Sequence, residues 1–193
     1  MPPWRLDDKV AIVTGAGNGL GKEYALYLAS LGAKVVVNDL GGSATGSGSS
    51  TSAADAVVSD IKQAGGEAVA NYDSVVEGEK IVQTAINTYG RVDIVVNNTG
   101  ILRDVSFKRM SEKDWEMVYQ VHLKGAFKVT RAAWPHMETN CYGRIVNITS
   151  PVGLYGNFGQ ANYVAMKRAL VGFTLTLALE GAKKQIKANV IAP

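Results

Sequence analysis

Short runs of β-branched residues alternate with longer amphipathic stretches along the whole chain, and this alternation most strongly constrains the fold. The runs predict strands over 9–14, 34–39, 67–72, 92–97, 143–149 and 186–192. The stretches between them predict helices over 19–31, 51–64, 76–89, 111–138 and 159–181. Strands that are apolar throughout, each followed by a helix, are typical of a parallel sheet covered on both faces. The sequence therefore predicts a doubly wound α/β fold.

Length and composition indicate one globular domain over 1–193. The chain has 193 residues, of which 47% are hydrophobic and 19% charged, and no shift in composition marks a linker. Its net charge of +3 is too small to predict a nucleic acid or a membrane as a partner. The longest nearly apolar run, 170–179, has about half the length of a membrane span.

The few cysteine and histidine residues argue against disulfides and metal sites. Cys141 is the single cysteine, so no intramolecular disulfide is possible, and we interpret it as a free thiol. Neither His122 nor His136 lies in a spacing typical of metal ligands. We therefore expect no metal.

A glycine-rich segment, TGAGNGLG at 14–21, joins the first predicted strand to the first predicted helix. Glycines permit a tight turn and let the backbone approach a diphosphate at the positive end of a helix dipole. The segment fits neither G-x-G-x-x-G nor the P-loop pattern, but it fits the wider T-G-x-x-x-G-x-G dinucleotide turn of a Rossmann fold. The alternative is a simple turn. The candidate cofactor-binding residues here are Gly15, Asn18, Gly19, Leu20 and Gly21.

Asp39 ends the second predicted strand, where an acidic side chain binds the adenosine ribose hydroxyls and repels a 2′-phosphate. Residues 40–60 contain no Arg or Lys that would offset this charge. The sequence therefore predicts NAD as cofactor in preference to NADP. A solvated or capping aspartate is the alternative interpretation.

Glycine and serine dominate residues 41–50, which follow Asp39. The simpler interpretation is a flexible surface loop. The alternative is a loop that closes over a ligand bound at the strand ends.

Tyr163 and Lys167 have the i,i+4 spacing that places a phenol and an ammonium on one face of a helix. A nearby cation is expected to lower the pKa of the phenol and make it a usable proton donor or acceptor. Ser150 follows the fifth predicted strand, at the edge where open α/β sheets bind ligands. Alone, the pair would be an ordinary surface pair, but together with the glycine turn and Asp39 it favours a catalytic group of Ser150, Tyr163 and Lys167.

On these features the sequence resembles the short-chain dehydrogenase/reductase family over essentially its whole length. The matching features are TGAGNGLG, Asp39, Asp73 after the third strand, NNTG at 97–100, Ser150, Tyr163 and Lys167. The resemblance implies that Asp73 and Ser74 bind the adenine and that Asn98 and Gly100 pack along the cofactor. It also implies that Tyr163, with Ser150 and Lys167, performs the proton transfer. Tyr163 and Lys167 would contact the cofactor as well.

Within this family, VVVNDLGG, AVANYDSV, GILRDVSF, RAAWPHM and YGNFGQANY are similar to the (3R)-hydroxyacyl-CoA dehydrogenase units of peroxisomal multifunctional enzymes. That similarity implies NAD-dependent oxidation of a (3R)-hydroxyacyl-CoA to the 3-ketoacyl-CoA in fatty acid β-oxidation. It also implies a peroxisomal location, the alternative being the cytoplasm. A ketoacyl or hydroxysteroid enzyme of the family and a nucleotide-binding module without turnover stay open as alternatives. A serine hydrolase has little support, since no G-x-S-x-G occurs.

The chain departs from the family pattern at two positions and at its end. Thr99 replaces the alanine of N-N-A-G, and His122 replaces an asparagine that positions a water on the active-site lysine. The resemblance implies that the family domain continues beyond Pro193 with its last strand and a mobile loop over the nicotinamide and the substrate. We therefore expect the C-terminal part of the domain, including that loop, to be absent.

The helices predicted over 111–138 and 159–181 carry more large apolar residues than one side of a sheet hides. These residues are Phe107, Trp115, Phe127, Trp134, Phe173 and Leu177. They lie either in the monomer core or in an interface. The family resemblance implies the second, a homodimer in which the two helices pack against their symmetry mates.

Overall fold

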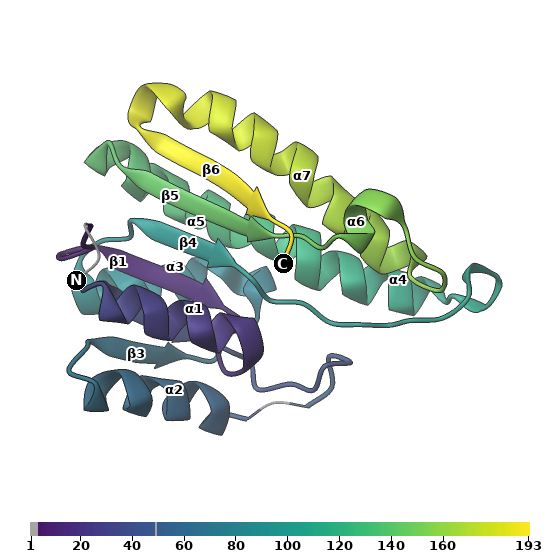
Figure 1. Ribbon diagram of the computed structural model, residues 1–193, viewed down its shortest axis with the longest axis horizontal. Helices are drawn as coiled ribbons and strands as arrows, with labels where there is room; N and C mark the ends of the chain where they lie inside the picture. The colour runs from purple at the N-terminus through teal and green to yellow at the C-terminus, as the bar shows by residue number, and fades with distance from the viewer. Residues whose placement is uncertain (1–3, 49) are drawn as a thin grey trace.

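The computed structural model describes residues 4–48 and 50–193, which form a six-stranded parallel sheet. The strand order is β3-β2-β1-β4-β5-β6 (Figure 1). Because the order reverses at β1, this is the Rossmann topology, and the predicted doubly wound fold is confirmed. The strands are β1 (Val10–Thr14), β2 (Lys34–Asn38), β3 (Ala68–Asn71), β4 (Ile94–Asn97), β5 (Gly143–Ile148) and β6 (Ile186–Ile191).

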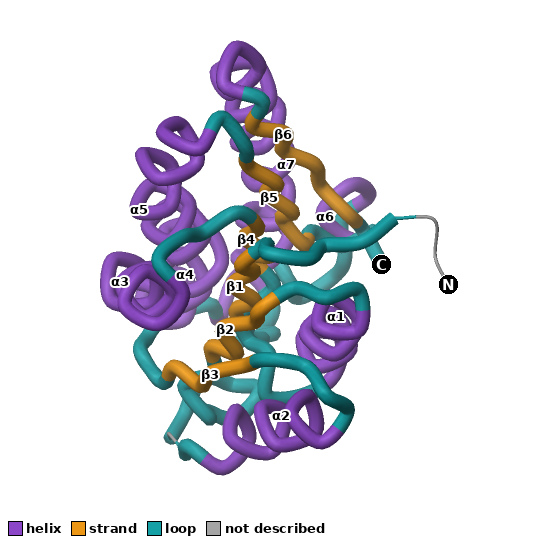
Figure 2. Tube along the Cα trace, turned by 90° about the vertical axis from the view of Figure 1, so that its left-hand side faces the viewer, coloured by secondary structure: helices purple, strands orange, loops and turns teal. Residues whose placement is uncertain are grey.

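Helices cover both faces of the sheet, with α1 and α2 on one face and α3, α4 and α5 on the other (Figure 2). Helix α7 belongs to the second group, because its Leu177 lies in the same core cluster as Val129 of α5. The helices are α1 (Gly19–Ser30), α2 (Ser52–Gln63), α3 (Gly78–Tyr89), α4 (Glu112–Tyr119), α5 (Gly125–Asn140), α6 (Val152–Tyr155) and α7 (Ala161–Gly181). Shorter 3-10 turns are η1 (Val75–Glu77), η2 (Phe107–Arg109) and η4 (Ala182–Lys184).

Successive residues of β1 belong to two different hydrophobic clusters. Val10 and Ile12 pack with residues of α3, α5 and α7, whereas Ala11 and Val13 pack with residues of α1 and α2. Side chains of a strand point alternately to the two faces of a sheet. Both sets are apolar because both faces are covered, which is why the strands appear as continuous apolar runs in the sequence.

The helix predicted over 111–138 contains a local widening that the sequence pattern does not indicate. Helix α4 continues into a π-helical turn, η3 (Gln120–Lys124), which continues into α5. Single π turns inside α-helices are frequent at functional sites. The turn contains His122, which is buried. The sequence pattern also fails to indicate α6, which has 4 residues.

The apolar residues predicted to form an interface differ in burial. Three of them are exposed: Phe107, Trp115 and Phe127. Two others, Trp134 and Phe173, are half-buried against the core. Leu177 is buried in the core, so a surface role for it is wrong. The exposed leucines of α7 are instead Leu175 and Leu179, at 62% and 80%. Within the described residues, no helix has both the length and the apolar character needed to cross a bilayer.

Candidate functional site

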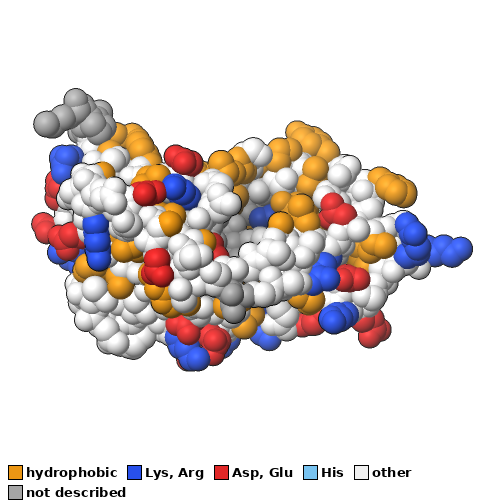
Figure 3. Space-filling model, turned by 90° about the horizontal axis from the view of Figure 1, so that it is seen from below, with side chains coloured by type: hydrophobic (Ala, Val, Ile, Leu, Met, Phe, Trp, Pro, Cys, Tyr) orange, Lys and Arg blue, Asp and Glu red, His pale blue; other side chains and the backbone are white. Residues whose placement is uncertain are grey.

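A cavity of about 650 Å³ lies at the carboxyl ends of the strands. Seen from below, the surface of the molecule is hollowed near its middle, with hydrophobic side chains gathered beside the hollow (Figure 3). Of the predicted site residues, the cavity is lined by Gly15, Asn18, Leu20, Asp39, Asp73, Ser74, Asn98, Gly100, Ser150, Tyr163 and Lys167. The structure thus brings the glycine turn, the acidic residue and the predicted catalytic group into one site.

Gly19 and Gly21 shape the turn without lining the cavity. Gly19 has a φ of +52°, and a Cβ at this position would meet no atom within 4 Å, so the start of α1 is open. A Cβ on Gly21 would lie 2.1 Å from the carbonyl oxygen of Gly15, so only glycine lets the helix approach the turn this closely. The first turn of α1 contains no acidic residue. Its N–H groups and dipole therefore favour an anion, as a dinucleotide diphosphate requires.

Both carboxylate oxygens of Asp39 are held by backbone groups. Oδ2 accepts a hydrogen bond from the Gly17 N–H, and Oδ1 accepts one from the Gly41 N–H, each at 2.7 Å. Each oxygen keeps a further lone pair for a ligand hydroxyl. This oriented carboxylate on the cavity wall fits the ribose of a dinucleotide.

Asp73, which lines the cavity as Ser74 and Asp39 do, is held by two asparagines at the ends of neighbouring strands. The side-chain amide of Asn38 donates to Oδ1 of Asn71 at 2.8 Å and to the carbonyl of Asp73 at 2.9 Å. The amide of Asn71 in turn donates to Oδ2 of Asp73 at 2.8 Å. Asn38 also lines the cavity, although sequence reasoning did not single it out.

Asn98 joins the end of β4 to the glycine turn. Its side-chain amide donates to the carbonyl oxygens of Thr14 and Gly15, both at 3.0 Å. The next residue, Thr99, lines the same cavity. Its hydroxyl is buried and has no hydrogen-bond partner within residues 4–48 and 50–193.

Tyr163 and Lys167 lie in the first two turns of α7, with the Lys167 Nζ 5.5 Å from the centre of the Tyr163 ring. Nζ is buried and donates to the carbonyl of Ile148 at 2.7 Å, and burial lowers the pKa of Lys167 to about 8. Burial also raises the pKa of Tyr163, although a hydrogen bond with Ser150 lowers it. The prediction that the pKa of Tyr163 is lowered is therefore wrong for this structure, in which burial has the larger effect.

His122 lies between the catalytic group and the backbone that follows β4. Its Nε2 lies 2.9 Å from both the N–H and the carbonyl oxygen of Ile101, so it accepts or donates according to the tautomer. For Nδ1, no partner exists among the described residues. Burial, and then the charge of Lys167, lowers the pKa of His122 to about 3, so the ring is neutral near pH 7. His122 lines the cavity, and its departure from the family pattern was the only sequence signal for it.

The glycine and serine loop after β2 lies against the cavity. Gly42, Ser43, Ala44 and Gly46 line it, and the Leu102 N–H donates to the carbonyl of Ala44 at 3.0 Å. This contact connects the loop to the segment after β4. The loop thus forms part of the cavity wall, and its closure over a ligand stays a prediction.

The short chain dehydrogenase family matches residues 9–193. The chain belongs to this family. Peroxisomal multifunctional enzyme A of Dictyostelium discoideum is 66% identical to the chain over 186 residues, which are 96% of this chain and 42% of that protein. Membership of this family and the geometry of the cavity support the predicted activity of an oxidoreductase acting on CH–OH groups.

Solved structures support the same assignment. Full-length peroxisomal multifunctional enzyme type 2 from Drosophila melanogaster is 50% identical, with a TM-score of 0.83 over 98% of this chain and 31% of that one. A 7α-hydroxysteroid dehydrogenase complexed with NADH and 7-oxo glycochenodeoxycholic acid is 35% identical, with a TM-score of 0.89 over 98% of this chain and 71% of that one. The family is typically NAD(P)-dependent. The chain spans less than half the length of either multifunctional enzyme.

Proposed function

We propose that this chain is an NAD-dependent dehydrogenase that oxidises a (3R)-hydroxyacyl-CoA to the 3-ketoacyl-CoA in peroxisomal fatty acid β-oxidation. The observation that carries the proposal is the presence of Asp39 and the group of Ser150, Tyr163 and Lys167 on the walls of one cavity. The similarity to peroxisomal multifunctional enzymes supports the substrate class and the location.

The residues of the cavity fit a nicotinamide dinucleotide. The open start of α1 at Gly19 would receive the diphosphate, and the Asp39 carboxylate would bind the adenosine ribose. Asp73 and Ser74 would hold the adenine, and Lys167 would donate to the second ribose. When bound, the nicotinamide ring supplies the hydride-accepting chemistry.

Tyr163 performs the proton transfer in this proposal. Its Oη takes the proton of the substrate hydroxyl, while the Ser150 hydroxyl holds the substrate oxygen by a hydrogen bond. Because burial raises the pKa of Tyr163, the phenolate needs a positive charge nearby. Lys167 supplies that charge below its pKa of about 8, and its ring-to-Nζ distance of 5.5 Å is short enough for a direct electrostatic effect.

Substitution of Tyr163 tests the catalytic assignment. Tyr163→Phe removes only the hydroxyl, so formation of NADH from NAD and a (3R)-hydroxyacyl-CoA should fall by about 100-fold or more, since general acid–base catalysis contributes that much. NADH affinity, measured by fluorescence, should stay the same. Tyr155→Phe is the matched control, because Tyr155 is 86% exposed on α6. Turnover by Tyr163→Phe at the wild-type rate would contradict the assignment.

Substrate choice separates the remaining functions. The structural similarity to a hydroxysteroid dehydrogenase makes a steroid alcohol the second candidate substrate. Oxidation of hydroxysteroids in preference to (3R)-hydroxyacyl-CoA would favour that function. Binding of NADH without turnover of either class would identify a nucleotide-binding module.

A further inference from the structure

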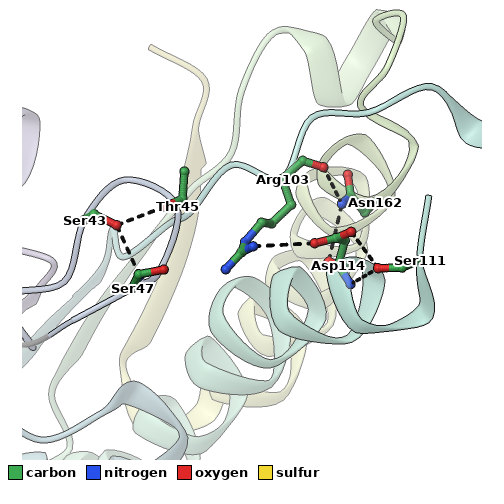
Figure 4. Close-up of polar contacts among 7 residues, drawn as sticks. All are labelled: Ser43, Thr45, Ser47, Arg103, Ser111, Asp114 and Asn162. Carbon is green, nitrogen blue, oxygen red and sulfur yellow. Dashed lines mark hydrogen bonds and ion pairs between the residues drawn. The ribbon is translucent and has the colours of Figure 1, made fainter. Parts of the chain in front are cut away.

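Arg103 directly follows Leu102, which lines the cavity, and its side chain extends between the loop at 43–47 and helix α4 (Figure 4). Its Nη1 forms an ion pair with Oδ1 of Asp114 at 3.6 Å. Its Nε is buried and lacks a hydrogen-bond partner in the part of the chain that the structure describes. A guanidinium has five N–H donors, so most of the capacity of Arg103 is unused.

The position of Arg103 is fixed relative to the catalytic tyrosine. The side-chain amide of Asn162 donates to the carbonyl of Arg103 at 3.1 Å and to that of Asp114 at 3.4 Å. Asn162 is buried and directly precedes Tyr163 on α7. The backbone of Arg103 is therefore tied to the residue that directly precedes Tyr163 on α7.

The loop at 43–47, which faces the side chain of Arg103, is uncharged and rich in hydrogen-bonding groups; its Ser43, Ala44 and Gly46 line the cavity. The Ser43 hydroxyl lies 2.9 Å from the Thr45 hydroxyl and accepts from the Ser47 N–H at 3.2 Å. No acidic side chain occurs between Leu40 and Ser50. Figure 4 shows these residues facing Arg103, with no bond drawn across the gap. An arginine opposite hydroxyl and amide groups is typical of sites that bind phosphate.

We propose that Arg103 and the loop at 43–47 bind a phosphate group of the coenzyme A part of the substrate. This inference rests on the proposed function, which makes the substrate an acyl-CoA thioester. The cofactor diphosphate has its own site at the start of α1. Arg103 provides a separate cation for the phosphates of the second ligand.

The ion pair between Arg103 and Asp114 is weak enough for Arg103 to bind a phosphate as well. Charge-assisted N–H···O bonds are usually about 2.7–2.9 Å long, whereas the Arg103 pair measures 3.6 Å. Asp114 is also held from its own helix, because the Ser111 hydroxyl donates to Oδ2 at 2.6 Å. Loss of Arg103 therefore leaves Asp114 with a partner, and loss of the Asp114 charge leaves Arg103 freer to bind a phosphate.

A comparison of thioesters tests the proposal. For Arg103→Met, the KM for the (3R)-hydroxyacyl-CoA should rise by about tenfold or more, which corresponds to the loss of a charge-assisted contact, with kcat within about twofold. The KM for the same acyl group on pantetheine, which carries no phosphate, should stay unchanged. Calorimetry with free coenzyme A should show the same loss of affinity without any turnover. The Kd for NADH should not change.

Two control variants separate a binding role from a structural one. Asp114→Asn should lower the KM for the CoA thioester, because it removes a competitor for the guanidinium. If Arg103 served only its ion pair with Asp114, both variants would have the same effect. Lys108→Met removes a positive charge from the same exposed segment and should change neither KM. If Arg103→Met does not fold, Arg103→Lys replaces it, with a smaller rise in KM confined to the CoA thioester.

Several results would overturn the proposal. An equal rise in KM for both thioesters would make Arg103 a positioning residue, and a weaker Kd for NADH would assign it to the cofactor. Unchanged affinity of Arg103→Met for coenzyme A would exclude a phosphate site. If the wild-type protein oxidises no hydroxyacyl thioester, the proposed function fails. Calorimetry with coenzyme A then still decides whether Arg103 binds phosphate.

Discussion

The imidazole of His122 lies edge-on to the ring of Tyr163, with 5.2 Å between the ring centroids and 83° between the planes. The π turn η3 brings His122 to this place, and Gly100 makes room for it, since a Cβ there would lie 2.8 Å from Cε1 of His122. Such an edge-to-face contact favours one orientation of the phenol. His122 therefore contributes to the placement of Tyr163.

The burial of His122 makes the stability of the protein depend on pH. The pKa of His122 is lowered from 6.5 to about 3 by burial and by Lys167. Between these values the unfolded chain binds a proton that the folded chain does not, so stability falls as the pH falls. At pH 5 this term alone destabilises the fold by about 2 kcal/mol relative to pH 7.

We expect His122→Asn to remove this dependence. Unfolding with urea at pH 7.5 and at pH 5 measures the free energy of unfolding of wild type and variant. From pH 7.5 to pH 5 the wild type should lose about 2 kcal/mol more of this free energy than the variant. His122→Gln should give the same shift, because neither side chain titrates. The same difference at both pH values would show that His122 is protonated in the folded protein.

Gly21 is expected to tolerate no side chain. A Cβ there would lie 2.1 Å from the Gly15 carbonyl oxygen and 2.5 Å from Nδ2 of Asn98. Gly21→Ala should therefore lower stability by about 1–3 kcal/mol, as overpacking does, and weaken NADH binding. The control is Lys22→Ala, which removes a surface pair with Asp60 and should cost less than about 1 kcal/mol. Calorimetry and NADH fluorescence measure both effects, and a Gly21→Ala protein like wild type would contradict the close approach of α1 to the turn.

The sequence predicted the parts of the site that depend on local spacing. Asp39 directly follows a strand, and Tyr163 and Lys167 share a helical face, so local rules of the chain are enough to predict these residues for the carboxyl edge of the sheet. The strands were predicted to within a few residues because two-sided burial makes them continuously apolar.

Other parts of the site depend on tertiary packing and left little trace in the sequence. Val121 and His122 reach the cavity on a π turn that apolar periodicity does not distinguish from an α-helix. The contact between Ala44 and Leu102 joins segments far apart in the chain. The pKa of Tyr163 was predicted in the wrong direction because spacing reports a nearby cation but not the extent of burial.

Asp39 is expected to set the choice of cofactor. Its carboxylate faces the cavity and would repel a 2′-phosphate, so wild type should bind NADH at least about tenfold more tightly than NADPH. Asp39→Asn keeps an acceptor oxygen for the Gly17 or Gly41 N–H but removes the charge. This variant should therefore bring the affinities for NADH and NADPH closer together. Replacing Asp39 by Ala together with Leu40→Arg should reverse the preference, so that NADPH binds more tightly than NADH. Equal affinity of wild type for both dinucleotides, measured by fluorescence titration, would refute the assignment.

Helix α7 is expected to form the interface of a homodimer. Leu175 and Leu179 lie one helical turn apart and are 62% and 80% exposed, which leaves an apolar stripe on the helix that carries Tyr163. In a two-fold symmetric contact such a stripe meets its own copy, so a single substitution acts twice. Leu179→Glu should therefore convert a dimer into a monomer without disturbing the core.

Analytical ultracentrifugation at micromolar concentration measures this change. Tyr27→Glu is the matched control, since Tyr27 is 56% exposed on α1, on the opposite face of the sheet, and this variant should stay dimeric. Because the dimer contact would brace α7, the Leu179→Glu monomer should also lose thermal stability and turnover. A wild-type protein that is monomeric and fully active at this concentration would rule out the interface.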